Sequence, residues 1–281
     1  MRAGGRRRLG RALFSIFRIR ALEGLQYRLA GLAGAATGIF WCLIEITVYI
    51  VFFTYADRAG IAGIANGLTL AQVITYSWLA QVLFTLQPNS VSGEILTMID
   101  KGDVGVELCR PLPLYSHWYA KNAADSCVRV MWRGAFTLLA GILMPGGLGM
   151  LPPASWAGLG CALLSLLSAF LLCAAFGTFM CAVRLNVKWG NGPMYIIALG
   201  SMVLSGTYLP LQLWPQALQG FLLFQPFAGY LDIPVRLYLG VLLPGDALWA
   251  LTLQLGWTAF FILLGRLVMA RRLKRIVVQG G

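Results

Sequence analysis

Most side chains capable of ionic chemistry lie in one polar interval, residues 87–133, of an otherwise apolar chain. The interval holds half of the ten acidic residues, several basic residues and the only histidine, His117, which we expect at its surface. Its acidic residues are Glu94, Asp100, Asp103, Glu107 and Asp125. Charges gathered between apolar segments favour a surface that contacts another molecule in water.

Residue types that catalysis or metal binding would need are scarce in this sequence. A hydrolase within the apolar segments would need a nucleophile facing a base, but the only histidine lies in the polar interval. The six cysteines form no CxxC pair, so we expect neither disulfides nor a metal site. The sequence contains no Gly-x-x-x-x-Gly-Lys-[Ser/Thr] motif for ATP binding. We therefore predict no catalytic residues and no metal ligands.

Glu45 is the one carboxylate deep inside a predicted membrane span, about 24 Å along the helix of residues 29–55. A charge at such a depth is energetically costly and often functional. It could line a substrate route, attract a cation, or pair with Arg133 or Arg236. A protonated carboxyl group hydrogen-bonded between helices is an equally good interpretation.

Polar residues also recur along the second apolar segment, residues 68–86. Gln72, Tyr76, Ser77 and Gln81 are spaced so that they form one wettable stripe on a helix. The stripe faces a pathway or forms hydrogen bonds with a neighbouring helix, and the sequence favours neither. We take Glu45, Gln72, Tyr76 and Gln81 as candidate pathway residues.

The composition indicates that lipid is the solvent for most of the surface. Of the 281 residues, 59% are hydrophobic and only 11% are charged, compared with roughly 25% charged residues in soluble domains. We predict an all-α membrane protein with six transmembrane helices. The predicted spans are residues 29–55, 68–86, 130–144, 154–183, 192–206 and 247–268.

Two further segments contact the membrane without crossing it. Residues 1–28 alternate apolar and Arg residues at helical spacing, which predicts an amphipathic helix in the headgroup plane. Residues 207–240 contain four prolines that leave apolar pieces too short to span. We predict a re-entrant helical hairpin on the outer side there.

Basic residues determine the predicted orientation. The chain has 22 Lys and Arg against 10 acids, a net charge of +12, and they gather at the ends of the spans. This distribution indicates topology and contact with anionic lipid rather than with nucleic acid. It places both termini, residues 87–133 and residues 184–191 on the cytoplasmic side.

Two local motifs stand out along the chain. They are Gly102-Asp103 followed by Glu107-Leu-Cys-Arg-Pro-Leu112, and Ser205-Gly-Thr-Tyr-Leu-Pro-Leu211 followed by Trp214-Pro215 and Gln225-Pro-Phe227. Together with the order of the parts, these motifs resemble the membrane subunits of type-2 ABC exporters, in a branch of short permeases with six spans. The resemblance covers nearly the whole chain.

The resemblance implies an efflux permease subunit in the bacterial inner membrane, in a family whose members move drugs, antibiotics, peptides, lipids and polysaccharide chains. A cytoplasmic segment, residues 1–28, would precede a single permease domain, residues 29–281. A second copy or a paralogous permease would pair with it, and cytoplasmic ABC ATPase subunits would bind ATP and Mg. The cytoplasmic loop 87–133 would carry the helix that contacts the ATPase. By position, the coupling residues are Gly102, Asp103, Glu107, Leu108, Arg110, Pro111, Leu112 and Tyr115.

An ion-coupled secondary transporter is the main alternative, because six spans could form a three-plus-three inverted repeat. Ion coupling generally uses several buried titratable groups, and Glu45 is the only one in the predicted spans. A scaffold or channel subunit also remains open. The substrate cannot be selected from the sequence.

Overall fold

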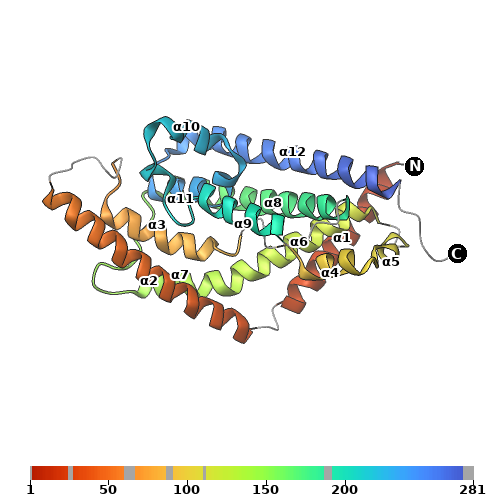
Figure 1. The fold of residues 1–281 in the computed structure, drawn as a ribbon, viewed down its shortest axis with the longest axis horizontal. Coiled ribbons are helices and arrows are strands. Elements are labelled where there is room, and N and C mark those ends of the chain that lie inside the picture. The colour runs from red at the N-terminus through yellow and green to blue at the C-terminus, as the bar shows by residue number, and fades with distance from the viewer. Residues whose placement is uncertain are drawn as a thin grey trace.

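A computed structural model describes residues 2–24, 28–59, 67–86, 91–109, 112–186 and 192–274. These residues form helices joined by short loops, and none of them lies in a strand. The predicted all-α class is therefore confirmed. The start of the first helix and the end of the last helix lie toward the same end of the bundle, close to two short helices, α4 (Gly93–Lys101) and α5 (Val104–Leu108) (Figure 1).

Within the described ranges, four helical segments are long and apolar enough to cross a membrane. Three correspond to predicted spans: α2 (Arg28–Arg58), α8 (Trp156–Asn186) and α12 (Ala247–Leu273). The fourth is a continuous helix, Leu114–Leu143. It consists of α6 (Leu114–Arg129), the π-helical turn η1 (Val130–Gly134) and α7 (Ala135–Leu143).

The fourth helix corrects the predicted boundary of the third span. We expected a span over residues 130–144 preceded by a loop, whereas the helix already begins at Leu114. Polar residues such as Lys121 and Asn122 are buried on its inner face, where protein groups satisfy them. The second half of the polar interval is therefore helix, because neighbouring helices replace water as its polar partner.

The other two predicted spans are shorter helices. α3 (Leu70–Leu83) has 14 residues and α9 (Gly192–Leu204) has 13. At about 1.5 Å per residue, each is about 20 Å long, less than the roughly 30 Å of a bilayer core. By length and composition, four helices in the described part of the chain could cross a membrane, and the predicted count of six spans is not confirmed.

Short helical pieces fill the proline-rich segment of residues 207–240. They are η2 (Leu211–Leu213), α10 (Gln216–Phe224), η3 (Pro226–Tyr230) and α11 (Asp232–Leu239). α11 is buried almost throughout and packs against α8 and α3. A further turn, η4 (Pro244–Asp246), leads into α12. Three of the prolines stand at the starts of these pieces, Pro210 before η2, Pro215 before α10 and Pro226 as the first residue of η3. The break expected at Pro234 is absent, because Pro234 lies inside α11, a core element of the protein.

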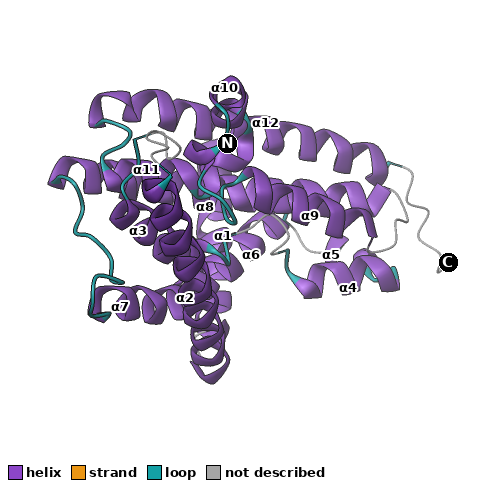
Figure 2. Ribbon diagram, turned by 60° about the vertical axis from the view of Figure 1, so that its left-hand side comes forward, coloured by secondary structure: helices purple, strands orange, loops and turns teal. Residues whose placement is uncertain are grey.

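The segment of residues 1–28 forms the predicted helix, α1 (Arg2–Gly24). Arg11, Ser15 and Arg18 are exposed, whereas Leu13 and Phe17 are half-buried. α1 packs against α6 (Figure 2 shows it behind the bundle). Its less exposed side therefore has a protein partner in addition to any contact with lipid.

α8 and α12 run side by side along the length of the bundle, with α8 in its interior and α12 along its upper edge (Figure 1). The buried Gln254 of α12 joins α8 and η3, because its amide donates to the carbonyls of Ser165, at 3.2 Å, and Gly229, at 2.8 Å. Its Oε1 accepts from the Ser165 hydroxyl at 3.1 Å. A fully satisfied amide fixes the register of the two long helices.

A glycine turn after α9 brings three elements together. Gly206 has a φ of 85°, which side-chain-bearing residues rarely adopt, and a Cβ there would collide with the Tyr76 hydroxyl. That hydroxyl donates to Asp232 Oδ1 of α11 at 3.0 Å. The turn therefore fits against α3 and α11 only because residue 206 has no side chain.

We predict that Gly206→Ala destabilises the protein by about 2 kcal/mol or more, because it adds backbone strain and a steric clash. Gly200→Ala is the matched control, since Gly200 lies in α9 with open space around its Cβ position. The midpoint of thermal unfolding in detergent measures both effects. Equal midpoints for the two variants would contradict this account of the turn.

Candidate functional site

The predicted coupling residues lie on two short helices, α4 (Gly93–Lys101) and α5 (Val104–Leu108), and on the start of α6. Gly102 ends α4 with a φ of 81°, so that the chain turns directly into α5. Asp103 is exposed beside it. Tyr115 is buried against Gly265 of α12, and Leu112 is half-buried. Arg110 and Pro111 lie outside the described residues.

Glu107 has its carboxylate inside the protein. Only 4% of its surface is exposed, and its Oε2 accepts from Trp118 Nε1 at 2.6 Å. The ammonium of Lys121 lies 3.4 Å from Oε1, and His117 Nδ1 lies 3.7 Å from Oε2. His117, which we expected at the surface, is 2% exposed. Lys121 follows His117 by four residues and Trp118 by three, so all three side chains lie on the face of α6 that is turned toward α5.

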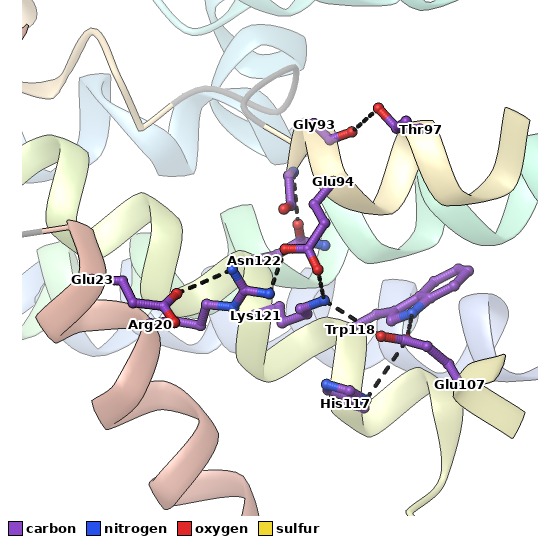
Figure 3. A network of polar contacts seen from close by, with 11 residues as sticks. Arg20, Glu23, Gly93, Glu94, Thr97, Glu107, His117, Trp118, Lys121 and Asn122 are labelled. Atoms are coloured by element: carbon purple, nitrogen blue, oxygen red, sulfur yellow. Dashed lines mark hydrogen bonds and ion pairs between the residues drawn. The ribbon is translucent and has the colours of Figure 1, made fainter. Parts of the chain in front are cut away.

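Lys121 connects this buried carboxylate to a second one. Its ammonium lies 2.9 Å from Oε1 of Glu94 on α4, and Arg20 of α1 donates to Oε2 of the same carboxylate (Figure 3). Burial alone would raise the pKa of Glu94, but Lys121 and Arg20 outweigh it and lower that pKa. Glu94 is thus held as the anion that joins α1, α4 and α6. We call Arg20, Glu94, Glu107 and Lys121 the charge bridge.

A separate ion pair attaches α4 to the centre of the bundle. The guanidinium of Arg184, near the end of α8, donates from Nη2 to both oxygens of Asp100 at 2.8 Å. Asn122 adds a link between α6 and α8, since its amide donates to the Thr178 hydroxyl at 3.0 Å. Side-chain contacts therefore attach α4 to α1, α6 and α8.

The outer side of the α4–α5 pair presents a different set of side chains. Val106 is 69% exposed, and Asp103, Leu108 and Cys109 are exposed near it. An exposed valine next to exposed charge is suited to a protein contact in water. The predicted coupling residues thus divide into an inward group that includes Glu107 and an outward group that includes Asp103 and Leu108.

A cavity of about 490 Å³ lies at the other candidate site, between α2, the end of α3, η1 and the segment after α9. Its surface is mostly apolar, with one carboxyl and one guanidinium group among its lining residues. The lining residues are Thr37, Trp41, Ile44, Glu45, Gln81, Phe84, Arg133, Thr207 and Tyr208.

The structure separates the four candidate pathway residues. Glu45 and Gln81 line the cavity. Gln72 instead caps α3, where its Oε1 accepts from the backbone N–H of Thr69 at 2.9 Å. Tyr76 is buried against Asp232. The predicted stripe on α3 therefore includes a cap and a helix contact as well as a cavity residue.

Sequence reasoning missed the ion pair between Asp232 and Arg236 on α11. Asp232 is fully buried, and Arg236 is nearly so. The spacing of four residues was a usable signal, because an acid and an arginine so placed meet on one helix face. The proline at position 234 led us to interpret this segment as a break instead.

We predict that Lys121→Met destabilises the protein by about 3 kcal/mol, because Glu107 then lies buried without its lysine partner. Glu107→Gln in the same chain is expected to restore at least half of the loss, since no buried anion remains. Thermal unfolding in detergent of both single variants and the double variant measures the coupling. Additive losses would show that the two residues do not interact.

Comparison with known proteins yields one family match, which spans most of the chain. Residues 39–280 match a family model described as "ABC-2 family transporter protein". The match begins within α2 and includes the α4–α5 pair and all the helices that follow. No curated protein matches the chain. The chain is thus a multi-pass membrane protein that belongs to the ABC-2 transporter family.

Proposed function

We propose that this chain is the permease subunit of an ATP-driven exporter and couples to separate ATPase subunits. Membership of the ABC-2 transporter family carries the proposal. ATP and Mg would be bound by the ATPase partners, and this chain would supply the membrane pathway. A second copy of the chain, or a paralogue, would complete that pathway.

The arrangement of α4 and α5 supports a coupling role. Two short helices with an exposed outer side are attached to three longer helices through the charge bridge and the Asp100–Arg184 pair. Movement of a partner bound to Asp103 and Val106 would therefore reach α1, α6 and α8 together. Glu107 would act from inside, by fixing α5 on α6.

The remaining features of the proposal concern placement in the membrane. The excess of basic residues supports a cytoplasmic location for the α4–α5 end and for both termini, in a bacterial inner membrane. α3 and α9 would complete six spans together with the four long helices. The cavity beside Glu45 and Gln81 would form part of the export route.

The exposed positions on α5 provide the test. Candidate ATPase subunits from the same genome are co-purified and reconstituted in liposomes with the wild-type chain or with the Asp103→Lys/Val106→Asp variant. We expect permease-dependent ATP turnover with the wild type and at least a tenfold loss with the variant. Both side chains are exposed, so folding should be preserved.

Arg271→Glu is the control, because it reverses an exposed charge near the end of α12 and leaves α5 unchanged. Equal loss in the control and the test variant would contradict a specific role for α5. Failure of the wild-type chain to bind any of the ATPases would contradict the exporter itself. Transport driven by an ion gradient would then become the leading function.

A further inference from the structure

Arg133 brings a cation into the cavity from the π-helical turn η1. Its guanidinium lies 4.6 Å above the Phe84 ring. A Cβ added at Gly38 of α2 would lie 3.2 Å from Arg133 Nη2, so the glycine leaves room for this side chain. Nε is buried without a hydrogen-bond partner among the described residues. π-Helical turns are rare and often occur at functional sites.

Glu45 brings a carboxyl group into the same cavity. The polar side chains of Tyr49, Ser77 and Gln81 surround its carboxyl group. Its Oε1 is nevertheless buried without a hydrogen-bond partner in the described part of the chain. Trp41, one turn earlier on α2, is more than half exposed and lines the cavity beside it.

The two opposite charges share the cavity without forming an ion pair with each other. Arg133 lies against Gly38, and Glu45 follows seven residues later on α2, which is about 10 Å along the helix axis. Gln81 lies between them, since its Oε1 would be 3.6 Å from a Cβ at Gly38 and its amide also contacts Glu45. Charges within a membrane usually pair or face a polar route. Among the described residues neither side chain has a counter-ion, and both line the same cavity.

We propose that the cavity binds a zwitterionic amphiphile, with its anionic group on Arg133 and its cationic group toward Glu45. Its apolar body would lie against the aromatic lining residues, Trp41, Phe84 and Tyr208. A ligand with only a positive charge would be repelled by Arg133, and a ligand with only a negative charge would be repelled by Glu45. A volume of about 490 Å³ suits a drug-sized molecule and is too small for a folded protein. As the substrate class of the export route, this inference rests on the proposed function.

Native mass spectrometry of the purified chain tests the binding. Three probes with the same acyl chain length are compared: lysophosphatidylethanolamine, which is zwitterionic, lysophosphatidic acid, which is anionic, and an alkylamine, which is cationic. We expect the wild type to retain the zwitterionic probe at least tenfold more than either of the others. Arg133→Gln should abolish this preference and favour the alkylamine, and Glu45→Gln should favour the anionic probe.

Asp57→Asn and Arg58→Gln are the matched controls, because they neutralise exposed charges at the far end of the same helix. Both should retain the wild-type pattern. Equal retention of the three probes by the wild type would overturn the proposal. An unchanged pattern in the two cavity variants, with their thermal midpoints intact, would also overturn it.

A second experiment distinguishes the two possible sources of the amphiphile, a resident membrane phospholipid and an exported molecule. A resident membrane phospholipid would co-purify with the wild type and be depleted in both cavity variants. An exported molecule would instead stimulate ATP turnover of the reconstituted complex when added as the lyso probe. Because binding is measured on the chain alone, a failure to assemble with ATPases would leave the binding result intact, and the two proposals fail separately.

Discussion

A charge surrounded by apolar groups needs a partner, and this requirement organises the structure. Lys121 joins Glu94 and Glu107, Arg184 holds Asp100, and Arg236 holds Asp232. Each of these contacts links helices or stabilises a helix that packs between others. In the Glu107–Lys121 and Asp232–Arg236 pairs both side chains are buried, so replacing one partner would leave the other buried without its counter-ion, at a cost of several kcal/mol. These ion pairs therefore help to hold the helices in their relative positions.

The two candidate sites differ in whether their charged groups are paired within the protein. At the α4–α5 end the charges are matched within the protein, so the helices are held together and move together. In the cavity, Glu45 and Arg133 face a common space without pairing. Matched charges suit transmission of a movement, and unmatched charges suit binding of a ligand that supplies the missing partners.

Several features could be predicted from the sequence because they depend on local composition. The apolar lengths of α2, α8 and α12 predicted membrane helices, and prolines marked the breaks around α10 and α11. The polar stretch from Leu114 to Arg129 was interpreted as a loop, because polar side chains usually indicate exposure to water. Partners such as Thr178 and Glu94, distant in the sequence, allow it to be a buried helix.

The sequence alone determined the all-helical membrane class, the concentration of charge in one interval, and the presence of a carboxylate within a span. These properties follow from residue type and from spacing along a single helix. Only the tertiary structure decided that Glu107 and His117 are buried, that Gln72 is a cap, and that Glu45 and Arg133 share a cavity. The direction in which a polar side chain points depends on which helix packs against it, and that choice is made by contacts between distant segments.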